Sequence, residues 1–233
     1  MRVLAVGAHP DDIEILCAGT LAACKARGDD IFMAVATDGR MGHKEILPPE
    51  LAQVRRKEQE AACKILGAEL VWLGFRDEFV FDNEGARNVV MDLYRRVKPD
   101  FILTHWNGCY HPDHRGVEKL MWDAGFVSSV KHVETAYPYH AAVTPFFHME
   151  PLAGVEFIPT EYVDISAHFA TKVQMLECHQ SQLKWLKDHD GIDIVEFMTT
   201  VARFRGIQAG VKYAEGFRRV NTWPRGTAMR LLP

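Results

Sequence analysis

The sequence predicts an α/β fold of the Rossmann-like type, in which helices flank a mostly parallel sheet. Apolar runs of strand length alternate with segments of helix length, and polar turns separate them. This alternation is typical of right-handed βαβ crossovers, which build parallel sheets. No linker rich in Pro, Gly and Ser, no repeat and no low-complexity segment divides the 233 residues. We therefore expect a single domain over residues 1–233.

The first half of the chain is the most regular part. Four strands are predicted, at residues 2–7, 30–36, 69–73 and 100–105. Helices are predicted between them, at residues 13–27, 50–66 and about 84–97. Gly28 and Gly67 are positioned to close the first two helices, and Pro99 stops the third.

Beyond residue 130 the pattern is less regular. Residues 134–137 and 161–165 are predicted as strands, with a proline-rich, aromatic loop between them. Helices follow at about 167–187 and 194–209. We expect the tail, residues 213–218, to pack on the domain or to cover part of it.

Composition excludes several classes of protein. With 48% hydrophobic and 25% charged residues the chain is typical of a globular protein, and its net charge of −4 argues against nucleic-acid binding. No apolar run is long enough to span a membrane, and no signal peptide is evident. The five cysteines include no C-x-x-C pair, which favours a reducing compartment. We therefore expect a cytoplasmic protein without membrane or nucleic-acid partners.

Two polar clusters follow predicted strands. Ala8-His9-Pro10-Asp11-Asp12 comes directly after the first strand, and His111-Pro112-Asp113-His114 comes shortly after the fourth. In a doubly wound sheet, strands one and four are neighbours at the point where strand order reverses, and ligands bind there. Two His and one carboxylate suit a catalytic zinc ion, which needs three protein ligands and an open position. The G-x-G-x-x-G fingerprint is missing after the first strand, which argues against a dinucleotide.

Each cluster also has a simpler interpretation. Asp11 and Asp12 could cap the helix that follows them, because aspartate at a helix N-terminus accepts hydrogen bonds from free N–H groups. His111 and His114 could lie in a solvated loop, and Asp113 could be only a helix cap. The pairing of the two clusters favours the metal site.

The paired motifs A-H-P-D-D and H-P-D-H resemble the PIG-L/LmbE family of zinc-dependent N-deacetylases. Further family motifs occur in the same order, namely Arg55-x-x-Glu58, Leu73-Gly74-Phe75-Arg76-Asp77, Lys98-Pro99-Asp100 and Tyr213-Ala214-Glu215-Gly216-Phe217. The resemblance covers most of the chain and is weakest at residues 140–160 and 185–210.

The resemblance implies a role for each residue of the paired motifs. His9, Asp12 and His114 would bind one Zn²⁺ per chain, or another divalent metal. Asp11 would be the general base that takes a proton from the attacking water. His111 would be a protonated partner that stabilises the oxyanion or helps the amine to leave. Either Asp11 or His111 could be the general acid.

Residues outside the triad are assigned by the same resemblance. Asp113 would orient a histidine, and Arg55 and Asp77 would hold sugar hydroxyls. Arg55 could equally be an ordinary exposed helix residue, and Asp77 a turn former. Cys109 departs from the family pattern, in which many members have an acid or Asn two residues before H-P-D-H. We expect the remaining histidines, including His105, to lie outside the site.

The expected activity is the removal of an acetyl group from a small N-acetylglucosamine-type glycoside by metal-activated water. Two alternatives remain open at this point: a zinc amidase acting on a non-sugar amide, and a metal-binding Rossmann-like module without turnover. The partner would be a small N-acetylated sugar, and a homo-oligomer is compatible with the family.

Overall fold

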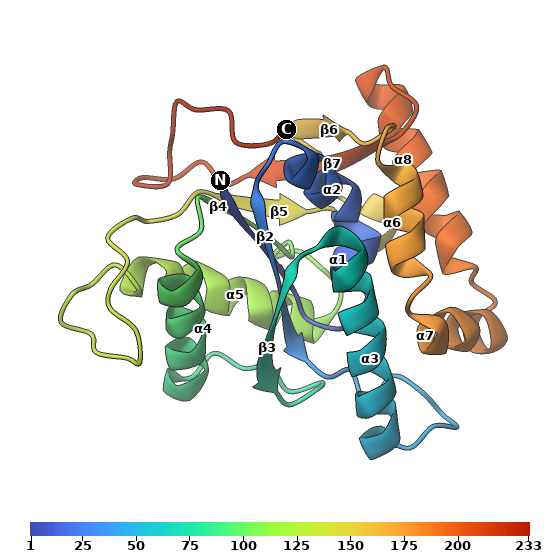
Figure 1. Ribbon diagram of the computed structural model, residues 1–233, viewed down its shortest axis with the longest axis horizontal. Coiled ribbons are helices and arrows are strands. Elements are labelled where there is room, and N and C mark those ends of the chain that lie inside the picture. Colours follow the sequence, from blue (N-terminus) through green and yellow to red (C-terminus); the bar gives the residue numbers. More distant parts are fainter.

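A computed structural model describes residues 1–233 and places one seven-stranded sheet between two layers of helices (Figure 1). The strand order is β3-β2-β1-β4-β5-β7-β6. All neighbouring pairs from β3 to β5 are parallel, and β7 runs antiparallel to both of its neighbours. The strands are β1 (Arg2–Gly7), β2 (Asp30–Thr37), β3 (Glu69–Phe75), β4 (Phe101–Thr104), β5 (Phe146–Met149), β6 (Glu161–Asp164) and β7 (Ala214–Arg219).

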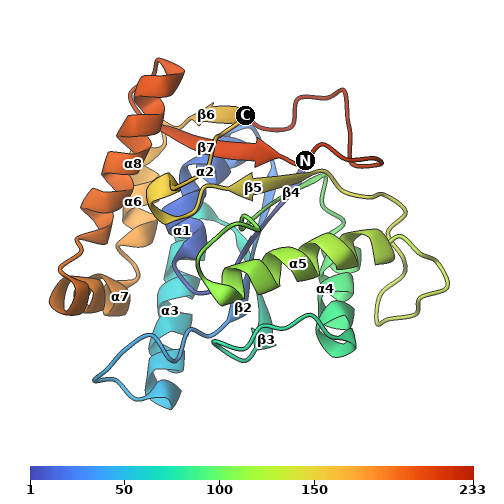
Figure 2. The ribbon, with the colours of Figure 1, turned by 180° about the vertical axis from the view of Figure 1, so that it is seen from behind.

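Helices cover both faces of the sheet. The helices are α1 (Asp12–Leu16), α2 (Ala18–Ala26), α3 (Pro48–Leu66), α4 (Glu84–Val97), α5 (Pro112–Val127), α6 (Phe169–Leu176), α7 (Gln180–Trp185) and α8 (Ile194–Ala209). A 3₁₀ turn, η1 (Leu152–Gly154), and a π-helical turn, η2 (Leu186–Asp190), complete the set. Helices α1, α2, α3 and α6 lie on one face, and α4 and α5 cover the other (Figure 2).

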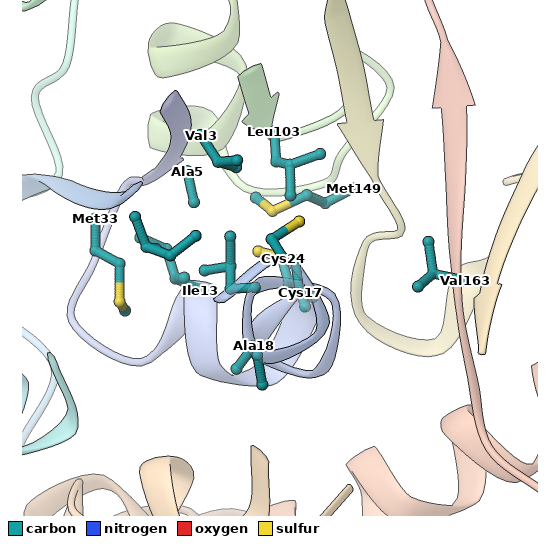
Figure 3. Close-up of a cluster of buried hydrophobic side chains, with 14 of the residues drawn as sticks. Val3, Ala5, Ile13, Cys17, Ala18, Cys24, Met33, Leu103, Met149 and Val163 are labelled. Carbon is teal, nitrogen blue, oxygen red and sulfur yellow. The ribbon is translucent and has the colours of Figure 1, made fainter. Parts of the chain in front are cut away.

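Alternation along β1 divides the core into two parts. Val3 and Ala5 belong to a cluster of 26 buried residues, whereas Leu4 and Val6 belong to a second cluster of 19. Figure 3 shows Val3 and Ala5 on the side of the sheet that carries Ile13. Because successive side chains of a strand point to opposite faces, an entirely apolar strand must be covered on both sides.

The functional edge of the sheet lies where β1 and β4 end side by side. β1 pairs in parallel with β2 on one side and with β4 on the other, so strand order reverses at β1. The predicted adjacency of strands one and four is therefore confirmed. The loops that carry the two polar clusters leave the same edge of the sheet.

Several predicted elements differ from the structure in the second half of the chain. Residues 134–137 form no strand; β5 lies instead at Phe146–Met149, inside the segment expected to be a loop, where its four residues are buried. The tail forms β7, which inserts between β5 and β6. These pairings join segments distant in the sequence, so local patterns do not reveal them.

Two predicted helices are interrupted. The helix expected at 13–27 is divided into α1 and α2 at Cys17, whose φ of −148° is not helical. The helix expected at 167–187 is divided into α6, α7 and the start of η2. Helix α5 was not predicted; it begins at Pro112 inside the second histidine cluster, so that His111 is its N-cap and Asp113 and His114 lie in its first turn. None of the helices has the length and apolar character that a membrane span requires.

Candidate metal centre

Asp11 and Asp12 stand at the start of α1, yet Asp11 does not act as a helix cap. Asp11 occupies the N-cap position with a φ of 103°, and its side chain makes no capping hydrogen bond. The Asp12 carboxylate turns back instead and accepts the backbone N–H of His9 at 2.7 Å. A left-handed backbone costs a non-glycine residue free energy, so the capping interpretation does not explain this corner.

Asp12 lies between the two predicted histidine ligands. One of its carboxylate oxygens is 3.4 Å from His9 Nδ1, and the other is 3.3 Å from His114 Nε2. Asp12 is 7% exposed and His114 is 5% exposed. The fold therefore brings together His9, Asp12 and His114, although more than a hundred residues separate His9 from His114 in the sequence.

The structure groups donor atoms of these residues in overlapping sets. Three sets have ligand atoms within 4.8 Å of one another: His9, His111 and His114; Asp12, His105 and His114; and His9, Asp77 and Glu78. Two of the histidines have a ring nitrogen that is already occupied. His105 Nε2 accepts the N–H of Ala8 at 2.9 Å, and His111 Nδ1 accepts the N–H of Asp113 at 3.2 Å.

The ring of His9 supplies the observation that best fits a metal ion. Its Nε2 is buried without a hydrogen-bond partner, although carboxylate oxygens of Asp113 and Asp77 lie 3.4 and 3.5 Å away. If Nε2 carries the ring proton and directs it at these carboxylates, the lone pair of Nδ1, which lies 3.4 Å from Asp12, is left for a metal ion. The imidazole and carboxylate donors around it are the ligand types that Zn²⁺ accepts.

The electrostatics of the centre favour positive charge. Burial lowers the pKa of His9, but the nearby carboxylates of Asp113 and Asp12 outweigh burial and raise this pKa to about 10. Burial likewise opposes a protonated His114, whereas the charge of Asp12 raises the His114 pKa to about 9. A site that holds protons on two neighbouring imidazoles stabilises cations, which is what a metal site requires.

Asp113 connects this centre to the loop after β3. Its carboxylate accepts the backbone N–H groups of Glu78 at 2.8 Å and Val80 at 3.1 Å. One oxygen of the same carboxylate is 3.4 Å from His9 Nε2, and Asp113 is 1% exposed. This is the arrangement that the predicted role of orienting a histidine needs.

His111 differs from its predicted state. Burial and the positive charges of His9 and His114 lower its pKa to about 4, so the ring is neutral at neutral pH instead of protonated. Because Nδ1 accepts the Asp113 N–H, the single ring proton lies on Nε2. His111 is half-buried and borders the cavity, where it can donate a hydrogen bond without carrying a charge.

Asp11 has the environment of a proton acceptor. Burial raises its pKa to about 6, although the nearby Arg55 guanidinium opposes this shift. Arg55 Nη2 donates to Asp11 Oδ2 at 3.0 Å and also to the Pro10 carbonyl. A carboxyl group with a pKa near neutrality can both accept and return a proton.

Arg55 and Asp77 line the cavity, but both are 3% exposed and are bound to the protein itself. Arg55 Nη1 donates to the Gly39 carbonyl at 2.9 Å, and a Cβ atom on Gly39 would lie 2.3 Å from that nitrogen. Asp77 accepts the Thr37 hydroxyl at 2.9 Å and the Met41 N–H at 2.8 Å. These bonds hold Asp11 and the loop after β2 in place; contact with sugar hydroxyls stays a prediction.

The expectation that His105 lies outside the site was wrong. Its ring is 1% exposed, stacks on His114 at a centroid distance of 3.8 Å, and has Nε2 3.2 Å from Asp12. Its place directly after the fourth strand could have identified it, because His9 stands similarly close behind the first. Cys109, which departs from the family pattern, lies at the site, with Sγ 3.1 Å from His114 Nδ1.

A cavity of about 450 Å³ opens in front of these residues. Five acidic side chains line it, and Arg55 is its only lysine or arginine. The acidic residues are Asp11, Asp12, Asp77, Glu78 and Asp190. Its opposite wall is apolar and includes Leu186 of η2 and Phe197 of α8. The cavity therefore has acidic side chains that can stabilise a cation and a separate apolar wall.

Comparison with known proteins gives one family match. The profile of the PIG-L family, described as GlcNAc-PI de-N-acetylase, matches residues 4–125, which is more than half of the chain. This range contains all the residues that form the metal centre. A diacetylchitobiose deacetylase of Thermococcus kodakarensis is 28% identical to the chain over 235 residues, covering 94% of this chain and 83% of the relative.

Two solved structures resemble the whole chain. An N,N′-diacetylchitobiose deacetylase from Pyrococcus horikoshii superposes with a TM-score of 0.82 at 26% identity and covers 94% of this chain and 83% of its own. A 4-carboxy-2-hydroxymuconate hydratase from Pseudomonas putida KT2440 superposes with a TM-score of 0.84 at 25% identity, with 99% and 100% covered. The fold is therefore shared by proteins named for two different reactions.

Proposed function

This chain belongs to the PIG-L family, and on that premise we propose that it is a hydrolase that removes the acetyl group from a small N-acetylglucosamine-type glycoside. The observation that carries the proposal is Asp11, a buried carboxylate with a pKa near neutrality beside a cluster of metal-binding side chains. Relatives named as deacetylases of chitobiose and of GlcNAc-inositol and GlcNAc-malate compounds support the same reaction.

We propose His9, Asp12 and His114 as the ligands of one divalent metal ion, with Zn²⁺ as the expected metal. The hydrogen bonds at His105 Nε2 and His111 Nδ1 support this choice, because they occupy lone pairs that a metal would need. When bound, such an ion supplies Lewis-acid polarisation of the amide carbonyl and lowers the pKa of water.

The residues of the chain then account for the movement of protons. Asp11 takes the proton from the attacking water, while Arg55 holds the carboxylate toward the cavity. The same carboxyl group returns this proton to the leaving nitrogen, which must be protonated before the C–N bond breaks. His111 donates from Nε2 to the carbonyl oxygen as negative charge develops there. Asp113 keeps His9 oriented through its contact with Nε2.

The charge of the cavity favours a neutral sugar over the substrate class of the hydratase relative. A carboxy-hydroxymuconate carries several carboxylates, and a site for it needs arginine or lysine side chains. Here the five acids face a single arginine, which is already bound to Asp11. Hydration of a carboxylated alkene is the second candidate, because the structure of the hydratase is similar to that of this chain. The acidic charge of the cavity argues against this reaction.

The two earlier alternatives receive less support. Relatives named as deacetylases of N-acetylated sugar compounds favour a sugar substrate over a non-sugar amide. A module without turnover would not need a general base, and Asp11 lines the same cavity as the proposed ligands.

The test is the release of acetate and of a free amine from diacetylchitobiose or N-acetylglucosamine by the zinc-loaded protein. The Asp11→Asn variant keeps the size of the side chain but cannot accept the proton. We expect kcat to fall by about 10²- to 10⁴-fold while bound zinc, measured by elemental analysis, is retained. Asp38→Asn is the matched control, since Asp38 pairs with Arg40 and does not line the cavity.

The outcomes separate the parts of the proposal. An Asp11→Asn variant with full activity would show that Asp11 is not the base. A wild-type protein that hydrates a carboxylated alkene and releases no acetate would establish the second candidate instead. Asp38→Asn should have wild-type kinetics in either case.

A further inference from the structure

Glu78 has a backbone conformation that its residue type does not favour. Five non-glycine residues have a positive φ, and of these only Asp11 and Glu78 line the cavity. Glu78 has a φ of 66°, in the left-handed region that glycine occupies at little cost. Such conformations persist where the surrounding structure enforces them, and they are concentrated at functional sites.

The turn that contains Glu78 is fixed from inside the metal centre. The Asp113 carboxylate accepts the N–H of Glu78 at 2.8 Å and the N–H of Val80 at 3.1 Å. Both bonds use backbone groups, so a glycine at position 78 would make the first of them equally well. The need for this turn does not explain why glutamate occupies the position.

The Glu78 side chain lies opposite His111. Its Oε1 is 3.8 Å from His111 Nε2, and the side chain is 44% exposed at the mouth of the cavity. His111 Nδ1 is already fixed by the Asp113 N–H at 3.2 Å, so the proton on Nε2 is directed at the cavity and at Glu78. Asp113 thus positions the groups on both sides of the His111 ring. The Asp113 backbone N–H faces Nδ1, and the Asp113 carboxylate holds the turn that places Glu78 near Nε2.

We propose that Glu78 is a positioning residue that acts through His111. Its carboxylate attracts the Nε2 proton and so fixes the plane of the ring, and the carbonyl oxygen of the substrate then shares the same N–H as a second acceptor. This inference rests on the proposed function, because it assigns His111 the task of donating to that oxygen. It also accounts for the backbone strain, since only a side chain that is long enough to reach His111 serves this purpose.

The test compares three substitutions at position 78 with one matched control. Glu78→Gly relieves the backbone and removes the carboxylate, and Glu78→Asn fits a left-handed backbone but is too short to reach His111. Glu78→Gln keeps an oxygen that accepts the Nε2 proton. The control is Glu156→Gly, because Glu156 is an exposed glutamate with a φ of 59° that does not line the cavity.

We expect kcat of Glu78→Gly and Glu78→Asn to fall about tenfold, with KM changed by less than about twofold. Glu78→Gln should retain at least about half of wild-type kcat. The Tm of Glu78→Gly should stay level or rise by up to about 3 °C, and Glu156→Gly should show the same Tm behaviour with unchanged kcat.

A readout independent of turnover separates this inference from the proposed function. Imidazole ¹⁵N and ¹H spectra should show His111 protonated at Nε2 in all variants, with an Nε2–H that is shifted downfield and protected from solvent exchange in the wild type and in Glu156→Gly, but shifted upfield and exchanging faster in Glu78→Gly. Wild-type kcat in Glu78→Gly, equal losses in Glu78→Gln and Glu78→Gly, or an unchanged His111 spectrum would each overturn the inference. If the wild type releases no acetate, the proposed function fails and the spectra still decide the role of Glu78.

Discussion

Asp11 and Asp12 are adjacent in the chain but have different surroundings. Asp12 is surrounded by histidine rings; burial alone would raise its pKa, but the charges of His114 and His105 hold it well below its usual range. Asp11 faces the cavity beside one arginine, and burial keeps its pKa near neutrality. A permanently ionised carboxylate suits a metal ligand, whereas one that titrates near neutral pH suits proton transfer. The proposed division of roles between the two residues follows from these environments.

Cys109 and Asp12 contact the two ring nitrogens of His114. Asp12 lies 3.3 Å from Nε2, and Cys109 Sγ lies 3.1 Å from Nδ1. If Nε2 binds the metal, Nδ1 carries the ring proton and the sulfur accepts it. We therefore expect Cys109→Ala to weaken zinc binding about tenfold, as measured by competition with a chromogenic chelator.

Two further variants make the test of Cys109 specific. Cys109→Asn supplies a carbonyl oxygen as acceptor and should restore most of the affinity. Cys24→Ala removes another buried thiol, far from the centre on α2, and should leave the zinc Kd unchanged. Equal zinc affinities of Cys109→Ala and wild type would show that the thiol does not orient His114.

Among the secondary-structure elements, β7 has a role beyond completing the sheet. Glu215 of β7 accepts the N–H groups of Gly19 at 3.0 Å and Thr20 at 2.7 Å, and thereby caps the start of α2. The Lys172 ammonium of α6 donates to Glu215 at 2.5 Å and to the Ile15 carbonyl of α1 at 2.7 Å. The tail of the chain thus fixes the two short helices that follow His9, the first of which begins with Asp12.

Loss of the Glu215 carboxylate should destabilise the fold strongly. Glu215→Ala leaves the ammonium of Lys172, which is 1% exposed, buried without its counter-ion. We expect the free energy of unfolding to fall by about 3–5 kcal/mol, measured by urea denaturation. Glu60→Ala is the control, since its ion pair with Arg56 is solvent-exposed and is worth about 1 kcal/mol or less. A loss from Glu215→Ala as small as that of the control would contradict the capping role.

For the whole molecule, the proposed metal centre and the hydrophobic core consist of different residues. The two large buried clusters consist of apolar side chains and contain none of the proposed ligands. The fold should therefore survive removal of the metal, unlike that of a small zinc domain, whose folding depends on the ion.

Chelation tests this separation. At a free zinc concentration about 100 times Kd, binding contributes about 2.7 kcal/mol, so removal should lower Tm by about 5–10 °C. Far-UV circular dichroism at 25 °C should not change. A His114→Ala variant should show a Tm that no longer responds to zinc. Collapse of the dichroism signal on chelation would show that the core cannot hold the fold without the ion.

The sequence by itself determined the parallel half of the sheet and the positions of the two histidine loops. Both depend on local signals: β1 is apolar from Val3 to Val6, and His9 and His111 lie in the segments that follow β1 and β4. In a doubly wound sheet strand order reverses between strands one and four, so the meeting of the two loops could be predicted.

Tertiary structure alone decided which groups around the centre touch each other. The contact of Asp113 with the turn at Glu78, the stacking of His105 on His114 and the capping of α2 by Glu215 join residues with no local pattern in common. The same is true of β5 and β7, which are defined by their partners in the sheet. The periodicity of apolar residues along the sequence indicates which face of a helix or strand is buried. Hydrogen bonds between distant segments depend instead on packing that only the folded chain provides.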